Sequence, residues 1–186
     1  FARKPIKKGQ VIERQHVYFS MPYEDGQLDS GHWRNGIVAN ADIKADGPLH
    51  VDHLHVPNDP NYKVIKDAVH EVKALLNEAR IALNSEFEVE YSHHYGIQRF
   101  KEYGAVIINV INREYCKKIL VQLPGQKHPS HYHKLKEETF QVLHGELHIT
   151  VEGRERTLMP GETCLVLPGV WHSFWTETGC VIEEVS

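Results

Sequence analysis

The feature that most constrains this chain is a set of three histidines and one glutamate that only a folded sheet can bring together. The chain contains 14 histidines in 186 residues, and His131 and His133 stand two positions apart. Successive side chains of an extended strand point to opposite faces, so these two imidazoles share a face. Glu138 follows after a turn, and His172 comes from a later hairpin behind a Pro-Gly pair. The sequence therefore predicts that the four side chains converge on one point.

This combination of donors suits a divalent metal ion. Three neutral imidazoles and one carboxylate are ligands of zinc, iron, manganese, nickel or copper, and they leave one or two coordination positions open. Calcium would require more oxygen donors. We expect His131, His133, Glu138 and His172 to be the metal ligands, with the identity of the metal left open. The alternative is that these histidines only fill a barrel interior.

The residues around the expected ligands form a more specific pattern. The first segment reads Gly125-Gln-Lys-His-Pro-Ser-His131-Tyr-His133-Lys-Leu-Lys-Glu-Glu138-Thr-Phe-Gln-Val-Leu-His-Gly145, and the second runs from Gly161 through Pro168 to His172. Together they resemble the two sequence motifs of the cupin family. The first motif matches at every defining position, and the count to its last glycine favours Glu138 over Glu137. The second motif is one residue longer than the family pattern between its glycine and its proline, but the ligand histidine is present.

The cupin resemblance implies a double-stranded β-helix, or jelly roll, over residues 97–186. Apolar and β-branched stretches in this region predict strands that are separated by Pro-Gly and Gly turns. The expected strands cover residues 105–111, 117–123, 138–143, 146–152 and 163–167.

Residues 1–55 contain a faint internal repeat. Ile6-Lys-Lys-Gly9 is echoed by Ile43-Lys-Ala-Asp-Gly47, and each copy leads into a short strand and a polar turn. These residues resemble the SAF domain, which is shared by type III antifreeze proteins and the C-terminal part of sialic acid synthases. Phe1 falls inside what should be the first strand of that domain. We therefore expect residues 1–55 to be an N-terminally truncated SAF domain, cut from a longer protein.

A helical segment connects the two regions. Apolar residues spaced alternately by four and three positions between Ile65 and Leu83 predict a helix that begins near Asp59-Pro60, within a linker over residues 56–96. We expect this helix either to pack on the cupin or to join the two domains. The alternative is that it forms a dimer interface, because the same spacing is typical of coiled coils. The predicted fold is thus mainly β: a small SAF domain, a linking helix and a cupin jelly roll.

Several side chains are candidates for binding a sugar beside the metal. Lys118 and Gln122 share one face of a predicted strand, where they either bind sugar hydroxyls or form a solvated face. Phe140 and Phe174 share parity with the glutamate and the last histidine of the ligand set, which predicts aromatic walls near the ion. The charged turn after the histidine pair is expected to be solvated. Its Glu137 is the candidate base, because it is the carboxylate of the motif that is not a ligand.

Composition excludes some classes of partner. The net charge is −4 with mixed signs, so no basic face is expected for nucleic acid or anionic lipid. No apolar run approaches the roughly 20 residues needed to cross a bilayer, and we expect a cytoplasmic location. The three cysteines lack the spacing of a metal site and are expected to be free thiols in a reducing compartment.

Three functions follow from these observations. A SAF domain followed by a helix and a cupin resembles the C-terminal region of bacterial sialic acid (N-acetylneuraminate) synthase-like proteins, which are transferases of nonulosonic acid biosynthesis. This resemblance implies a homodimer and a condensing (β/α)8 barrel domain as partner, which is absent here, so this chain alone would lack synthase activity. The second function is a metal-dependent cupin sugar isomerase or epimerase, since the cupin region also resembles sugar isomerases, lyxose isomerase included. The third is a non-catalytic binding or assembly module. The first is our expectation.

Overall fold

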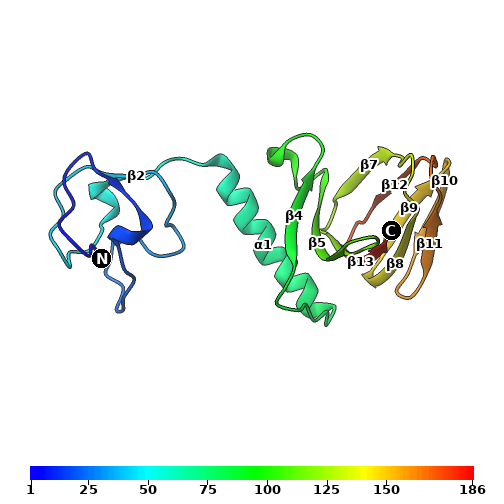
Figure 1. Cartoon of the computed structure of the whole chain (residues 1–186), viewed down its shortest axis with the longest axis horizontal. Helices are drawn as coiled ribbons and strands as arrows, with labels where there is room; N and C mark the ends of the chain where they lie inside the picture. The colour runs from blue at the N-terminus through cyan, green and yellow to red at the C-terminus, as the bar shows by residue number, and fades with distance from the viewer. The chain divides into compact units, whose positions relative to one another are not determined.

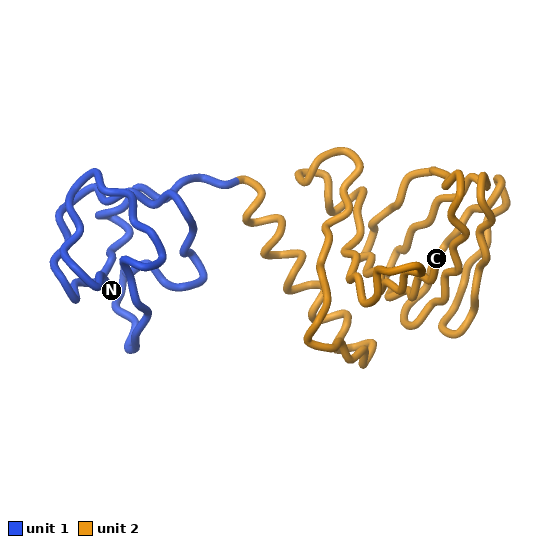
Figure 2. The backbone as a smooth tube through the Cα atoms, viewed as in Figure 1, with its two compact units in different colours: residues 1–59 blue, residues 60–186 orange.

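The computed structural model describes residues 1–186, and the chain divides into two compact units, Phe1–Asp59 and Pro60–Ser186 (Figure 2). Each unit has a hydrophobic core of its own. The segment expected to be a linker over residues 56–96 is thus largely part of the second unit.

The first unit consists of short extended pieces. Strands β1 (Val11–Ile12), β2 (Ile37–Ala39) and β3 (Leu54–His55) form one small antiparallel sheet in the order β1-β2-β3. Ile6 and Ile43, which occupy matching positions in the two copies of the repeat, exchange both backbone hydrogen bonds at 2.8 Å. Two 3-10 turns complete the unit, at Arg14–His16 and Val51–His53. Its short strands and turns agree with the sequence pattern, and the SAF assignment stays a prediction.

Helix α1 (Pro60–Glu78) is the one α-helix of the chain, and it begins at the predicted Asp-Pro pair. Its buried residues Ala68, Val72 and Leu76 share a core with strands of the larger sheet, and α1 lies beside strand β4 (Figure 1). The helix therefore packs on the β-sheet of its own unit. No helix of the chain combines the length and the apolar character that spanning a membrane requires.

Two antiparallel sheets make up the rest of the second unit (Figure 1). Side chains of both sheets, among them Phe140, Ile149 and Phe174, form a shared core, so the sheets pack face to face. Strands distant in sequence are neighbours in both sheets, which is the crossover pattern of a jelly roll. The six-stranded sheet has the order β11 (Thr163–Val166), β8 (Glu138–Gly145), β13 (Cys180–Val185), β6 (Cys116–Gln122), β5 (Gly104–Asn112) and β4 (Glu88–His93); the four-stranded sheet has the order β10 (Arg154–Leu158), β9 (Leu147–Val151), β12 (His172–Trp175) and β7 (Lys127–His131).

Strand β4 was not expected, because the sequence pattern placed it in the helical linker. It pairs with β5 over its whole length, from Glu88 opposite Asn109 to His93 opposite Gly104. A 3-10 turn, Ile97–Arg99, then leads into β5. Strand β4 thus extends the six-stranded sheet and forms its edge.

Candidate metal centre

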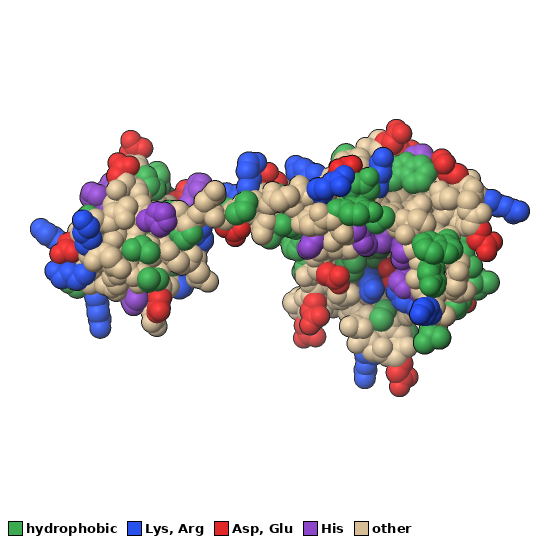
Figure 3. Space-filling model, turned by 90° about the horizontal axis from the view of Figure 1, so that it is seen from above, with side chains coloured by type: hydrophobic (Ala, Val, Ile, Leu, Met, Phe, Trp, Pro, Cys, Tyr) green, Lys and Arg blue, Asp and Glu red, His purple; other side chains and the backbone are tan.

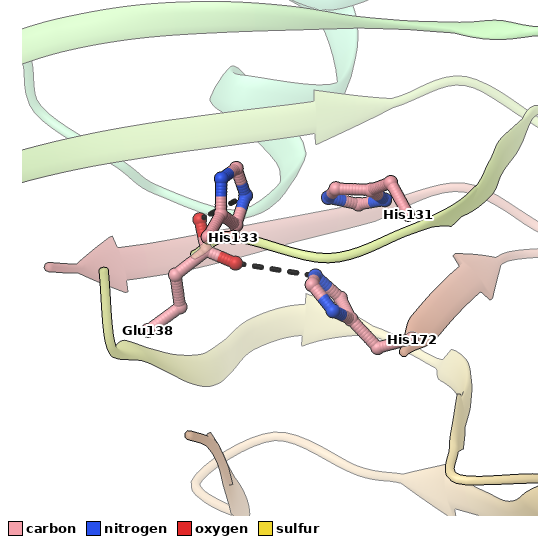
Figure 4. A group of neighbouring side chains, drawn as sticks. All are labelled: His131, His133, Glu138 and His172. Carbon is pink, nitrogen blue, oxygen red and sulfur yellow. Dashed lines mark ion pairs between the residues drawn. The ribbon is translucent and has the colours of Figure 1, made fainter. Parts of the chain in front are cut away.

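The structure brings the four expected ligands together. His131 is the last residue of β7, His133 lies just beyond it, and Glu138 and His172 are the first residues of β8 and β12. Their ligand atoms all lie within 4.8 Å of one another, and the side chains point toward a common centre (Figure 4). His131 and His172 are direct partners across two strands of one sheet, whereas Glu138 comes from the opposite sheet. The group therefore lies between the two sheets.

Backbone carbonyl groups orient two of these histidines. The Nδ1 atom of His131 lies 3.0 Å from the carbonyl oxygen of Pro129, and that of His172 lies 3.2 Å from the carbonyl oxygen of Val170. A carbonyl oxygen only accepts hydrogen bonds, so each Nδ1 carries the proton. Each Nε2 then has a free lone pair directed at the centre, which is the arrangement of metal-binding histidines.

Two polar atoms at the centre have no hydrogen-bond partner. Glu138 Oε2 and His172 Nε2 lie 3.1 Å apart, yet neither makes a hydrogen bond with suitable geometry, and both are buried. Leaving such an atom unpaired costs about 1–3 kcal/mol. A divalent cation bound by the four side chains would satisfy both atoms, so the residues fit the metal that the donor types predict.

Electrostatics also favours the ligand forms of these groups. Burial raises the pKa of Glu138, but its contacts with His172 and Lys136 outweigh burial and hold the pKa well below its usual range. Burial lowers the pKa of His131. The carboxylate is thus charged and the imidazole neutral near pH 7, as metal binding requires.

A cavity of about 200 Å³ borders the ligand group, and histidine, basic and acidic side chains gather around a hollow in this unit (Figure 3). Three of the predicted sugar-binding residues, Lys118, Phe140 and Phe174, line the cavity. Gln122 does not, because it is fully buried farther along β6. The other lining residues are His94, Ile107, Leu120, His128, His131, His133, Lys136, Glu138 and Glu184.

One wall of the cavity is charged. Lys136 Nζ lies 2.7 Å from Glu138 Oε1 and 2.7 Å from Glu184 Oε1, and Lys118 Nζ lies 3.4 Å from the same oxygen of Glu184. Neither Lys136 nor Glu184 was predicted from the sequence as a site residue. Lys136 was expected to lie in a solvated turn. Glu137, the predicted base, is exposed and lies outside the cavity.

A signal for Glu184 was present in the sequence. The last strand carries two adjacent carboxylates among apolar residues, and Glu184 shares parity with Cys180 and Ile182, which are buried. In the structure Glu184 is opposite Lys118 on β6 and opposite Phe140 on β8.

The other wall carries two further histidines that sequence reasoning did not single out. The Nε2 atoms of His94 and His128 lie 2.9 Å apart. His128 stacks on Phe174 with 4.6 Å between ring centroids and 7° between ring planes, and its centroid is 4.5 Å from that of His131. Burial is the main cause that lowers the pKa of His128 to about 3, so its imidazole is neutral near pH 7.

Comparisons with known proteins agree with the β architecture. Residues 119–182 match the Cupin domain family. The D-lyxose/D-mannose isomerase of Thermosediminibacter oceani is 28% identical over 153 residues, which cover 66% of this chain and 84% of that protein. The D-lyxose ketol-isomerase of a Thermofilum species is 27% identical over 154 residues, which cover 67% of this chain and 86% of that protein.

Solved structures resemble part of the chain. An RmlC-like cupin from Shewanella frigidimarina shows 21% identity and a TM-score of 0.46, and the match covers 56% of this chain and 86% of that one. The Cnp3 cupin domain of Schizosaccharomyces pombe shows 13% identity and a TM-score of 0.43, and the match covers 53% of this chain and 67% of that one. The cupin prediction is thus supported by the family match to residues 119–182. None of these matches supports a SAF domain or descent from a sialic acid synthase.

Proposed function

We propose that this chain is a metal-dependent aldose–ketose isomerase that acts on a free monosaccharide. The observation that carries the proposal is a carboxylate, Glu184, that lines the same small cavity as the metal-ligand group without being part of it. The two isomerases that resemble this chain act, by their names, on D-lyxose, and one of them also on D-mannose. This function was the alternative in the sequence analysis, and it is better supported than the synthase that we expected.

The proposed metal ligands are His131, His133, Glu138 and His172. A divalent ion held there would polarise neighbouring carbonyl and hydroxyl oxygens of a sugar. Three of the four ligands are uncharged, so the site would keep a net positive charge that favours oxygen ligands carrying partial negative charge. Which metal binds is not specified by this donor set.

Glu184 is the group that we assign to proton transfer. Isomerisation moves one proton from C2 to C1 of the sugar and another from the C2 hydroxyl to the carbonyl oxygen at C1, so no external reactant is consumed. Glu184 Oε1 and Glu138 Oε1 contact the same ammonium group, that of Lys136, at 2.7 Å each. Lys136 thus bridges the proposed base, Glu184, and the expected ligand Glu138. Glu184 is therefore close enough to reach a sugar carbon whose oxygen is bound at the ligand group.

The two lysines of the charged wall complement this role. Removal of the C2 proton places negative charge on the sugar oxygens, and preorganised cationic donors stabilise such charge. Lys118 and Lys136 both contact Glu184 and line the cavity. They would hold the carboxylate in position and stabilise the enediol intermediate of the sugar.

The size of the cavity favours a small substrate. Its volume of about 200 Å³ is below the roughly 300–1,000 Å³ of pockets for drug-sized ligands. Its apolar walls include Phe140 and Phe174, which are almost fully buried and would exclude water from the reacting carbons. A single unphosphorylated sugar fits these properties.

The test is isomerisation by the purified chain in deuterated water. Protein prepared without added metal would first be analysed for metal content, then loaded separately with manganese, zinc, iron and nickel. We expect D-lyxose or D-mannose to form the corresponding ketose, with deuterium at the carbon that receives the proton, as observed by NMR. The variant His131→Ala should lose both bound metal and conversion. If the metal-loaded protein neither converts nor deuterates any pentose or hexose of a panel, the proposal is wrong.

A further inference from the structure

The histidine pair on the second cavity wall has no part in the isomerisation chemistry described above. His94 and His128 line the cavity, and their Nε2 atoms lie 2.9 Å apart. His94 directly follows strand β4, which is the edge of the six-stranded sheet, and His128 lies on β7, the edge of the four-stranded sheet. Their hydrogen bond therefore connects the two sheets at one side of the cavity.

The two rings differ in how firmly they are held. His128 is held between Phe174, on which it stacks, and the expected ligand His131, whose ring centroid is 4.5 Å away. His94 is exposed and its ring centroid lies 4.4 Å from that of His128. The three imidazoles thus form a row that leads from the metal-ligand group to the exposed rim of the cavity.

The hydrogen bonding of the pair suits a hydroxyl group. In a bond between two neutral imidazoles, one ring donates and the other accepts. A sugar hydroxyl does both, so it can enter between the rings, accept from one and donate to the other. This exchange replaces one hydrogen bond by two, and both Nε2 atoms keep a partner.

We propose that the His94–His128 pair recognises the hydroxyl end of the sugar that lies farthest from the metal and selects between five- and six-carbon substrates. The inference rests on the proposed function, because C1 and C2 of the sugar must lie at the ligand group and near Glu184. The remaining carbons then extend along the row of imidazoles toward the rim. The additional hydroxymethyl group of a hexose would meet His94.

The experiment measures binding and turnover separately. Dissociation constants of D-lyxose and D-mannose would be determined by calorimetry for the metal-loaded Glu184→Gln protein, in which turnover should be at least about 100-fold slower, with and without His94→Ala. KM and kcat would be determined in the otherwise native chain. We expect His94→Ala to weaken binding of D-lyxose roughly 3- to 10-fold, the effect of one neutral hydrogen bond, and to change KM more than kcat. The D-mannose to D-lyxose affinity ratio should rise at least about threefold, because the rim is widened.

Two further variants separate recognition from a structural role. His94→Gln keeps a donor and an acceptor and should restore part of the affinity for D-lyxose. His70→Ala removes an exposed histidine of α1 that does not line the cavity, and should leave both dissociation constants unchanged. Metal content and Tm would be measured for every variant.

The outcomes are distinguishable. If His94→Ala leaves the affinity ratio unchanged, whether or not Tm falls, the pair is only a structural connection between the sheets and the inference is wrong. If neither sugar binds the metal-loaded protein, the inference and the proposed function both fail. If both sugars bind with the expected dependence on His94 but the native chain does not convert them, the inference stands and the proposed function is wrong.

Discussion

Glu184 is a buried carboxylate, 4% exposed, whose charge is balanced by two ammonium groups. Burying an ionised carboxylate is unfavourable unless it is paired and hydrogen-bonded. Lys136 and Lys118 supply that compensation, and Lys136 also links Glu184 to the expected ligand Glu138. The four residues form one charged network along the cavity, so the effect of each on activity depends on the others.

Replacing Glu184 by Gln should slow proton transfer strongly while leaving the metal site intact. Gln keeps the size of the side chain but is not a base, so kcat for the proposed isomerisation should fall by about 10²- to 10⁴-fold. Metal content should not change, because Glu184 is not in the ligand group. Steady-state kinetics and metal analysis of the same preparation measure the two effects.

Glu137→Gln is the matched control for this prediction. Glu137 is exposed and lies outside the cavity, so its replacement should change kcat less than about twofold, as for a surface residue far from the chemistry. A large loss of activity in Glu137→Gln with an active Glu184→Gln would reverse the assignment of the base.

The sequence predicted the position of a site residue where that position depends on spacing along one strand. The expected ligands followed from alternation in a strand and from the spacing of the turns, and parity predicted Phe140 and Phe174 near them; in the structure both line the cavity that borders the ligand group. Lys136 and Glu184 were not predicted, because their positions depend on which strands become neighbours. Gln122 shows the limit of parity: it is on the same face as Lys118 but lies too far along β6 to reach the cavity.

Turns determine how closely the strands can approach one another. Gly145 ends β8 with φ of 77° and is opposite Cys180, the first residue of β13. A Cβ atom at Gly145 would overlap the carbonyl oxygen of Gly179. Gly153 lies in the turn between β9 and β10 with the same φ, 77°, but a Cβ there would meet nothing within 4 Å.

We expect Gly145→Ala to destabilise the chain much more than Gly153→Ala. Both variants place a Cβ in the left-handed region, which costs about 1–2 kcal/mol. Only Gly145→Ala must also separate β8 from the chain entering β13, which should add about 1–3 kcal/mol by analogy with overpacked cores. Urea unfolding of the two variants measures the difference, and equal losses would show that the strands are not so close at Gly145.

Among the larger elements, the sequence predicted the helix and the strands β5, β6, β8, β9 and β11, but not the edge strand β4. The apolar spacing of α1 is regular, and Asp59-Pro60 is a recognisable start. In β4 most residues are exposed, so burial leaves no strong pattern, and the strand is specified mainly by pairing with β5. Such pairing joins residues far apart in sequence and is not visible in a local pattern.

The molecule as a whole consists of two units with separate cores. The core of residues 1–59 contains residues of the first unit alone, such as Ile6, Ile37 and Ile43. The two cores of residues 60–186 contain residues of the second unit alone, and α1 contributes to one of them. The cavity and the ligand group are also formed within the second unit. The sequence predicted a domain on either side of the helical segment and left open whether the helix packs on the cupin or joins the two domains, because a regular apolar face does not reveal which surface covers it.

The fragment 60–186 should therefore fold alone and keep the metal site. We expect it to bind one equivalent of metal per chain, and a saturating metal concentration 100 times its Kd should stabilise it by about 2.7 kcal/mol. Calorimetry should show the same metal-dependent transition in the fragment and in the full chain. A shorter fragment, residues 97–186, is the informative comparison, because it lacks α1 and β4 and would expose the sheet residues that share a core with α1, such as Val106, Ile108 and Val121. It should be much less stable or aggregate. If the 97–186 fragment is as stable as the 60–186 fragment, α1 is a linker after all; if the 60–186 fragment loses metal binding, the site depends on residues 1–59.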